Sequence, residues 1–267
     1  MGRRLPVRLP QPGLPVAIRD LYRRGLETLF GSWEAYARGS GGAELIRGHG
    51  FAAAVFPTEP ERAIYNNAVL DRGLGRQRRR ETIDALASVY AEAGVDRYAA
   101  WAHDGDGPMR AELDGGPFLL AETTRVMGRS LEDLDRAAGE VEVEPFDWPR
   151  YLAYLTAEGL PEGLLSGVDP SAFHVLGVRL DGRDVASAIA FDHDGDCGIF
   201  NMGTLEPFRR RGLGGAVLAR HLEEAADRGC STASLQSTPI AEGVYRAAGF
   251  RDLGRFLEYV PQGSGSA

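Results

Sequence analysis

Hydrophobic residues recur along this chain at two spacings, which divide it into helices and strands. Apolar positions three and four residues apart predict helices over 16–33, 81–93, 148–158, 213–228 and 240–248. Short apolar or alternating runs predict strands over 51–56, 63–70, 97–103, 118–126, 141–146, 173–180, 184–191, 197–205, 233–237 and 250–260. This mixed order of strands and helices indicates an α/β (α+β) fold.

The second half of the chain repeats the order of elements and some short sequences of the first half. The sequence RGLG occurs at 72–75 and again at 211–214, and GPMRA at 107–111 corresponds to GVYRA at 243–247. Both pairs are separated by nearly the same number of residues, which indicates a duplicated domain. Chance matches in a chain rich in Ala, Gly and Arg are the alternative. We therefore expect a first domain over 1–139 with an extended arm over 1–15, a second over 140–260, and a flexible tail over 261–267.

The composition narrows the class of protein. Of 267 residues, 43% are apolar and 25% are charged, which is typical of a globular protein with a sizeable core. The net charge of −8 argues against nucleic acid and anionic membranes as partners, although it suits a cationic one. With two cysteines and no long apolar run or signal peptide, the sequence predicts a cytoplasmic protein without a disulfide framework.

The stretch FRRRGLGGAVL at 208–218 has the features of an anion-binding loop. The first N–H groups of a helix have no partner inside the helix, and glycines allow a phosphate to approach them. Arginines beside the loop add charge-assisted hydrogen bonds. A Walker loop is excluded because the chain contains no lysine, and a dinucleotide loop fits poorly because Val217 stands where its third small residue is required.

The order of this loop, a helix, a strand and then TPIAEGVYRAAGF resembles the GNAT superfamily of acyl-CoA N-acyltransferases. Arg209, Gly212 and Gly214 occupy the places of the family's Gln/Arg-x-x-Gly-x-Gly/Ala loop. The later family signature is matched by Ala241, Val244, Tyr245, Gly249 and Phe250, whereas Thr238 replaces its asparagine. The resemblance covers about 140–260, and the first half shares only the layout.

The resemblance implies two tandem GNAT-like domains, each with a mixed, mostly antiparallel twisted sheet that is flanked by helices and splayed after its fourth strand. It implies transfer of an acetyl or other acyl group from the co-substrate acetyl-CoA to a primary amine, by direct attack in a ternary complex without a metal. The expected cofactor-binding residues are Met202, Gly203 and Thr204 along pantetheine, Arg209, Arg210, Arg211, Gly212, Leu213, Gly214 and Gly215 at the diphosphate, and Thr238. Tyr245 is the expected acid that protonates the thiolate.

Several assignments within this half have alternatives. Tyr245 could instead be a core residue that packs the short helix onto the sheet. The strand 197–205 contains no carboxylate, so we expect a water chain near Asn201 to take the amine proton. Cys197 as a nucleophile is a weaker possibility. The acidic stretch 192–196 resembles a calcium loop but is better explained as a solvated turn.

The first half is expected to be a degenerate copy. At the place of the loop stands 71–75 with an aspartate, the following helix is predicted to begin at about residue 81, and Met109 replaces the tyrosine. A second, non-catalytic CoA site there is the alternative. For the function of the whole chain, the alternatives are a non-catalytic acyl-CoA sensor and an acyltransferase like the tandem mycothiol synthases. The acceptor could be a small molecule or a peptide, and the chain could form a homodimer.

Overall fold

The computed structural model describes residues 18–58, 65–134, 141–160 and 165–263. The helices are α1 (Ile18–Arg38), α2 (Arg76–Glu92), α3 (Gly107–Asp114), α4 (Trp148–Glu158), α5 (Leu213–Asp227) and α6 (Glu242–Ala247). The strands are β1 (Glu44–Gly48), β2 (Phe51–Val55), β3 (Asn67–Leu70), β4 (Ala99–His103), β5 (Phe118–Ser130), β6 (Glu144–Pro145), β7 (His174–Leu180), β8 (Arg183–His193), β9 (Asp196–Thr204), β10 (Thr232–Ser237) and β11 (Arg251–Pro261).

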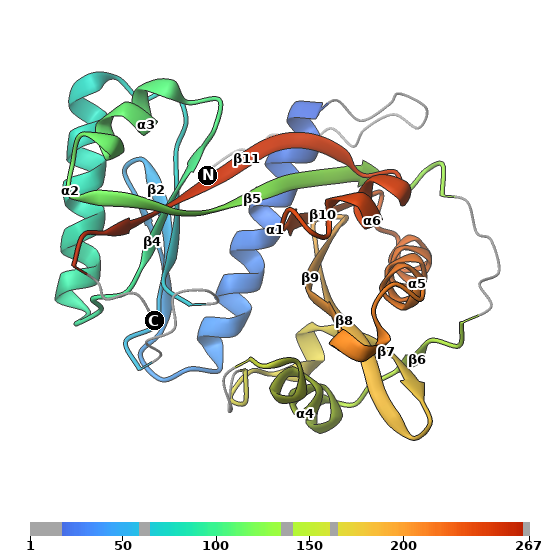
Figure 1. The fold of residues 1–267 in the computed structure, drawn as a ribbon. Helices are drawn as coiled ribbons and strands as arrows, with labels where there is room; N and C mark the ends of the chain where they lie inside the picture. Colours follow the sequence, from blue (N-terminus) through green and yellow to red (C-terminus); the bar gives the residue numbers. More distant parts are fainter. Residues whose placement is uncertain (1–17, 59–64, 135–140, 161–164, 264–267) are drawn as a thin grey trace, which may run out of the picture.

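These strands form one sheet in the order β1-β2-β3-β4-β11-β5-β10-β9-β8-β7-β6. Two neighbouring pairs, β3 with β4 and β9 with β10, are parallel, and the others are antiparallel. Each parallel pair belongs to one half of the chain and is joined through a helix, α2 in the first half and α5 in the second (Figure 1). The predicted α/β class, with a mostly antiparallel sheet flanked by helices, is confirmed.

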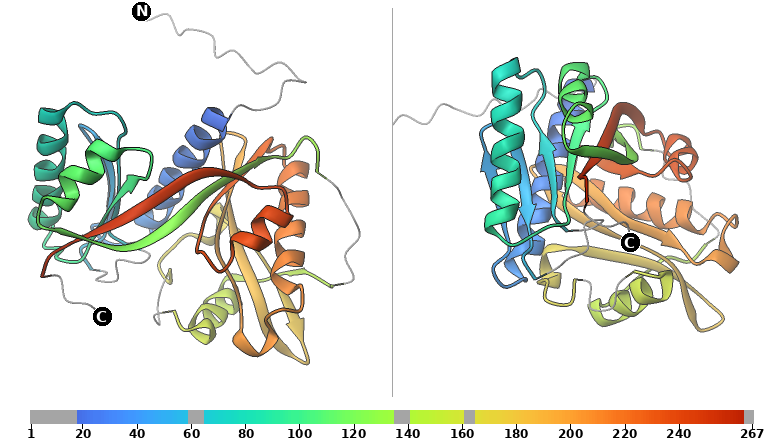
Figure 2. Two further views of the ribbon diagram at one scale, coloured as in Figure 1. Left: turned by 45° about the horizontal axis from the view of Figure 1, so that its top comes forward. Right: turned by 60° about the vertical axis from the view of Figure 1, so that its left-hand side comes forward.

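Two long strands, β5 and β11, join the halves. They run side by side across the molecule (Figures 1 and 2), and each is the last strand of its own half. Residues 125–130 of β5 pair with β10 of the second half, whereas residues 256–259 of β11 pair with β4 of the first. The two predicted sheets are therefore one continuous sheet. The predicted boundary at 139–140 lies outside the described residues.

Helix α1 packs against strands of both halves. Its Gly25 lies against Ser234 of β10, where an added Cβ would come within 2.8 Å of the serine Cβ. Its buried face includes Leu29, Trp33 and Tyr36. On the second half, α5 covers the sheet with the stripe predicted from its sequence, namely Leu213, Val217, Leu218, Leu222 and Ala225. Because α1 contacts both halves, the site described below lies between this helix and the two halves of the sheet.

The structure differs from the predicted elements at several points. Helix α2 begins at Arg76, directly after Gly75, and not at about residue 81. The first turns of α2 carry arginines and lack apolar residues at helical spacing, so the sequence pattern gave no sign of a helix there. Gln77 nevertheless donates a hydrogen bond to Glu81 one turn later, as in a regular helix. β1 and α3 were not predicted, and β6 is limited to 144–145. The predicted arm over 1–15 and residues 264–267 of the tail lie outside the described residues.

Candidate functional site

A cleft opens where β9 and β10 separate. The two strands pair only between residues 196–198 and 232–234, and beyond that point they diverge around a cavity of about 320 Å³. This is the splay that the resemblance implied. Its lining residues come from both halves of the chain and are Leu29, Ser32, Trp33, Tyr36, Asn67, Trp101, Glu122, Thr124, Ile199, Phe200, Asn201, Met202, Gln236, Thr238, Ala241, Tyr245 and Glu258.

A bulge turns β9 at the mouth of the cleft. The pairing with β8 shifts register between Ile189–Phe200 and Ser187–Gly203, and Asn201 has a φ of 48°. Positive φ is uncommon outside glycine and often marks a functional site. The Asn201 amide donates a 3.3 Å hydrogen bond to the Tyr151 hydroxyl, which fixes its orientation. The bulge thus follows the last pair of β9 with β10, at Gly198, and lies where the two strands have separated.

The segment expected to hold pantetheine follows this bulge. Met202 lines the cleft, while Gly203 and Thr204 pair with β8 on the opposite edge of the strand. Gly203 is needed for packing, because an added Cβ would lie 3.0 Å from the Tyr154 hydroxyl and 3.1 Å from Glu158 Cδ. The α4 side of this segment is therefore closed, and the cleft side is the open one.

The N-terminus of α5 lies at the end of the same strand. Gly212, the residue before the helix, has a left-handed φ of 81°, and no side chain caps the helix. The first intrahelical bond here is from the Ala216 N–H to the Gly212 carbonyl, so the N–H groups of residues 213–215 have no helical partner. Added Cβ atoms at Gly212 and Gly215 would meet no atom of the described residues within 4 Å, whereas one at Gly214 would lie 3.4 Å from Thr204 Oγ1. These positions fit an anion-binding helix end.

The three arginines of the loop have different surroundings. Arg209 Nε donates to the Thr204 carbonyl at 2.8 Å, and its guanidinium lies 3.4 Å from Glu158, so it braces the loop against β9 and α4. Arg210 has a φ of 64°, and the guanidinium of Arg211 lies 5.6 Å from the Phe208 ring centre. All three are exposed, with Arg210 and Arg211 beside the open helix end.

Tyr245 lies on α6 and lines the cleft, although it is only 5% exposed. Burial raises the pKa of its phenol to about 12, so it holds its proton at neutral pH. Its ring meets Phe250 edge-on at 5.9 Å, and its hydroxyl makes no hydrogen bond to another described residue. Glu242 anchors the start of α6 through ion pairs with Arg125 and Arg255. The phenol is thus both packed and adjacent to the cavity.

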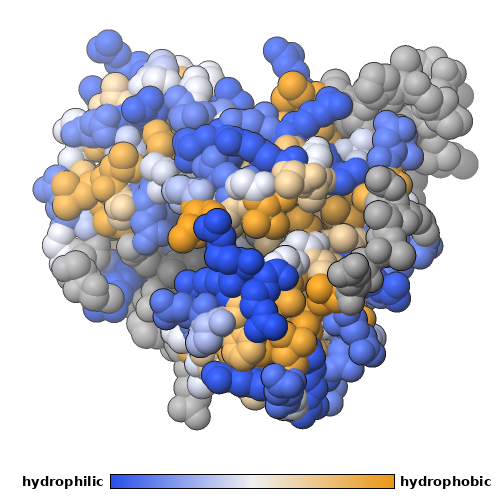
Figure 3. Space-filling model, turned by 45° about the vertical axis from the view of Figure 1, so that its right-hand side comes forward, coloured by the Kyte–Doolittle hydropathy of each residue, from blue (hydrophilic) through white to orange (hydrophobic). Residues whose placement is uncertain are grey.

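The connection between β10 and α6 borders the same cleft. Thr238 lines it and is exposed, and its carbonyl accepts a 3.1 Å hydrogen bond from the Ala241 N–H. Ile240 is 91% exposed and Val244 is 40% exposed. Figure 3, in which the right-hand side of Figure 1 is turned forward, shows hydrophobic side chains gathered between hydrophilic ones on that face.

Two weaker sequence interpretations do not suit the geometry. Cys197 is fully buried, is not among the lining residues, and burial raises the pKa of its thiol well above the usual value, which opposes a nucleophilic role. In the acidic turn, Asp192 pairs with Arg228 and the buried Asp196 accepts hydrogen bonds from hydroxyl groups. Within the described parts of the chain, no group of three or more potential ligands could hold a metal.

Sequence reasoning missed the residues that the first half and the last strand bring to the cleft. Glu122 of β5 and Glu258 of β11 are opposite each other in the strand register, and Trp101 of β4 is opposite Glu258 on the other side. Glu258 is more than 130 positions from both of the others, and none of the three belongs to a local motif. Only knowledge of the long-range strand order could have identified them.

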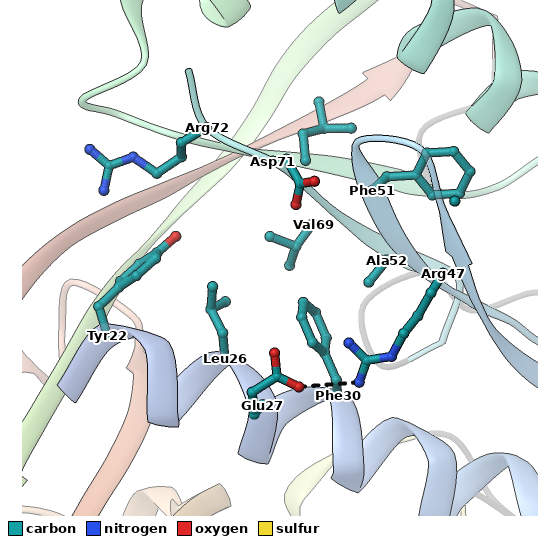
Figure 4. A pocket seen from close by; sticks show the side chains of 12 residues that line it. Tyr22, Leu26, Glu27, Phe30, Arg47, Phe51, Ala52, Val69, Asp71 and Arg72 are labelled. Carbon is teal, nitrogen blue, oxygen red and sulfur yellow. Dashed lines mark hydrogen bonds and ion pairs between the residues drawn. The ribbon is translucent and has the colours of Figure 1, made fainter. Parts of the chain in front are cut away.

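A second cavity, of about 330 Å³, lies in the first half (Figure 4). Tyr22 and Glu27 of α1 line one side of it, and Asp71, which follows β3, lies across from Glu27. Glu27 is paired with Arg47 at 3.3 Å. Arg47 and Arg72 also line the cavity, so its charged side chains are of both signs.

In the first half, the loop over 71–75 also differs in the hydrogen bonds of its backbone. The Gly73 N–H donates a 2.8 Å hydrogen bond to Asp106, so a carboxylate of the protein already occupies it. Met109 is buried in the core. However, α2 begins directly at the end of the loop, so the late helix start expected from the sequence does not distinguish this half from the second.

Part of the chain matches a known protein family. Residues 131–250 match the model of the acetyltransferase (GNAT) family. This segment includes α4 to α6 and β7 to β10, and therefore both sides of the cleft. This segment, which is less than half of the chain, is therefore similar to the GNAT acetyltransferases. No curated protein sequence matches the chain.

Solved structures share the fold over nearly the whole chain. A GCN5-related N-acetyltransferase from Kribbella flavida is 17% identical, with 94% of this chain and 98% of that one covered and a TM-score of 0.71. Another, from Sphaerobacter thermophilus, is 15% identical, with 94% and 96% covered and a TM-score of 0.60. A tandem GNAT protein from the clavulanic acid biosynthesis pathway is 12% identical, with 95% and 99% covered and a TM-score of 0.58.

Helices that could cross a bilayer are not found in the described residues, because none is both long and apolar enough.

Proposed function

We propose that the chain transfers an acetyl group from acetyl-CoA to a primary amine in the cleft between β9 and β10. The proposal depends on the closeness of two features, namely an anion-binding helix end and the cleft. The uncapped N-terminus of α5 reaches the strand end at Thr204, two residues after Met202, which lines the cleft together with Tyr245. One extended ligand with an anionic end and a reactive end could therefore span both.

In this arrangement the diphosphate of acetyl-CoA binds the free N–H groups of residues 213–215, and Arg210 and Arg211 lie at its rim. Pantetheine extends along residues 202–204 on the edge of β9 that β10 leaves open. Thr238 lines the opposite side of the cleft, and the exposed Ile240 follows it two residues later. The open space at Gly212 and Gly215 is the feature of this structure that fits a closely bound phosphate.

The chemistry follows from the groups beside the reactive end. The amine nitrogen attacks the thioester carbonyl carbon, the carbonyl π electrons move to oxygen, and a backbone N–H near Met202 or Gly203 stabilises that oxygen. When the carbonyl re-forms, the C–S bond breaks and the thiolate takes the Tyr245 proton. The proton lost by the amine returns to the phenolate through water near Asn201. Tyr245 is thereby restored.

A non-catalytic acyl-CoA sensor uses the same binding features without Tyr245 chemistry, and a mycothiol-synthase-like enzyme differs in its acceptor. Neither has an observation in its favour that the amine acyltransferase lacks. The cytoplasmic location, the division at 139–140 and a dimeric state stay predictions.

The deciding experiment combines thiol release with product analysis. The full chain is incubated with acetyl-CoA and a panel of amines, free CoA thiol is measured, and acetylated products are identified by mass spectrometry. We expect amine-dependent thiol release with one acetylated product per thiol. Saturable acetyl-CoA binding without thiol release for any amine would overturn the enzyme proposal and favour the sensor.

A further inference from the structure

The inner wall of the cleft combines helix α1 with the sheet of the first half. Asn67 and Val69 of β3 are the register partners of Ala99 and Trp101 of β4. Paired residues, and alternate residues along one strand, share a face of the sheet, so Asn67 and Trp101 are diagonal neighbours on one face. Both line the cavity, as does Tyr36 of α1. The wall therefore brings an amide, an indole and a phenol to the same space.

Asn67 occupies a position whose neighbours are apolar. It is 3% exposed, and Val69 and Ala99 beside it belong to the hydrophobic core under α1. A buried amide costs free energy unless it forms hydrogen bonds. Among the residues that the structure describes, Asn67 Oδ1 has no such partner. Packing alone would favour an apolar side chain here, so the amide indicates a bound partner.

Two further polar atoms of this wall lack partners. Trp101 Nε1 and Tyr36 Oη are buried, and neither forms a hydrogen bond within the described structure. Both side chains, like that of Asn67, are more than nine-tenths buried. Packing fixes their rings, because Trp101 meets Trp33 at 5.7 Å and Tyr36 stacks on Phe173 at 5.2 Å. Buried polar groups in native proteins are normally satisfied, so three unsatisfied ones around one cavity indicate a ligand that bonds here.

The charged groups beside this wall are already engaged. Glu122 and Glu258 line the same cavity, and each has an interaction partner of its own. Burial raises the pKa of the Tyr36 phenol well above its usual value and that of Tyr245 to about 12, so both hold their protons at neutral pH. The unsatisfied groups of the wall are therefore neutral. They require an acceptor atom for the indole N–H and a donor for the asparagine oxygen.

We propose that this wall selects the acceptor, and that the acceptor is a small amine whose other end carries an uncharged carboxamide. The inference rests on the proposed function. The carboxamide oxygen accepts a hydrogen bond from Trp101 Nε1, its N–H donates to Asn67 Oδ1, and the Tyr36 hydroxyl bonds to the same group. The amine end reaches the thioester beside Met202 and Tyr245 in its neutral form. The cavity of about 320 Å³ is at the small end for ligand sites and suits a short acceptor.

Binding is tested independently of transfer. The full chain with bound CoA is titrated calorimetrically with 4-aminobutanamide and with 4-methylpentylamine, in which an isopropyl end replaces the carboxamide at nearly the same size. A third titration uses 4-aminobutanoate, which has the same shape and adds a negative charge. We expect the amide to bind at least tenfold tighter than either of the others. Equal or tighter binding of the apolar amine or of the carboxylate would overturn the inference.

Two conservative variants distinguish a ligand site from a structural one. Tyr36→Phe and Asn67→Leu each remove an unpartnered polar group and keep a side chain of similar size. Loss of an unsatisfied buried group should leave the melting temperature unchanged or raise it, whereas binding of the amide should weaken several-fold. If one variant does not fold, Trp101→Phe replaces it, because it removes the indole N–H and keeps an aromatic ring. Unchanged amide binding in the folded variants would overturn the inference.

Tyr98→Phe is the matched control. Tyr98 is also buried, but it stacks on Tyr90 of α2 in a separate hydrophobic cluster and is not among the described residues that line the cleft. This variant loses a phenol hydroxyl outside the cleft and should keep the preference for the amide. An equal loss of amide binding in Tyr98→Phe and Tyr36→Phe would refute a specific role for the wall.

Transfer measured with 4-aminobutanamide and 4-methylpentylamine separates this inference from the proposed function. Preferential binding of the amide without any acetyl transfer would leave the binding site and refute the enzyme. Equal kcat/KM for acetylation of the two amines would leave the enzyme and refute the carboxamide site.

Discussion

The Thr28 hydroxyl on α1 donates a 2.8 Å hydrogen bond to Oδ2 of Asp196 at the start of β9, 168 positions further along the chain. The same carboxylate accepts hydrogen bonds of 2.6 Å from Thr232 and from Ser234 of β10. Asp196 therefore joins α1 to both strands at the point from which they diverge. The width of the cleft depends on this buried junction.

Thr28→Val should destabilise the fold and widen this junction. The buried carboxylate would lose one of its donors, which costs about 1.5–3 kcal/mol. The free energy of unfolding, measured in urea, should fall by this amount. Thr156→Val is the matched control, because its hydroxyl makes only an exposed bond to the Leu152 carbonyl one turn earlier. An equal loss in both variants would contradict a special role for the junction.

Tyr245→Phe should lower kcat at least tenfold and leave acetyl-CoA binding unchanged. The ring would still pack against Phe250, but the thiolate would lose its proton donor. Steady-state kinetics and acetyl-CoA titration separate the two effects. Because burial raises the phenol pKa to about 12, the wild-type rate should not fall between pH 7 and 9 through this group. Unchanged kcat in the variant would make Tyr245 a packing residue only.

Gly215→Ala should separate stability from cofactor binding. Alanine favours a helix over glycine by about 0.8–1 kcal/mol, and the added Cβ meets no protein atom within 4 Å. A bound diphosphate would occupy that space, so acetyl-CoA affinity should fall at least tenfold while the melting temperature holds or rises. Gly107→Ala, at the open first turn of α3, is the control and should leave affinity unchanged. If Gly215→Ala binds acetyl-CoA as tightly as the wild type, the helix end is not part of the binding site.

His221 should make the fold acid-sensitive. Burial lowers its pKa from 6.5 to about 4, and within the described residues only its Nε2 has a partner, the Ala188 carbonyl at 3.1 Å. Between these two pH values the unfolded chain binds a proton that the folded chain does not bind. The free energy of unfolding should therefore fall as the pH is lowered from 6.5 to about 4, by up to about 3 kcal/mol.

The measurement compares urea unfolding of the wild type and of His221→Gln across this pH range. The variant should show a flatter profile, because glutamine keeps a donor for Ala188 and does not titrate. His49→Gln, on an exposed turn, is the control. Parallel profiles for the wild type and His221→Gln would show that another group dominates.

Local patterns predicted the elements that have their own local signals. Helix α4 was predicted at its observed bounds, and α5 to within one residue, because a cap or a glycine marks their ends. The start of α2 was missed because solvated arginines carry no apolar period. Arg209, Gly212 and Tyr245 could be nominated because they fall within two short motifs. Glu122 and Glu258 could not, because their meeting depends on the pairing of β5 with β11.

The exchange of last strands between the halves has a consequence for synthesis on the ribosome. Strand β4 pairs with β3 early but acquires its second neighbour, β11, only when residues 256–259 have emerged, about 150 positions after β4 itself was made. Contacts so distant in sequence slow folding and leave intermediates exposed. The nascent first half would hold an unfilled place in its sheet until β11 has been made, so a stop codon before Arg251 should disrupt both halves of the sheet and not only the second.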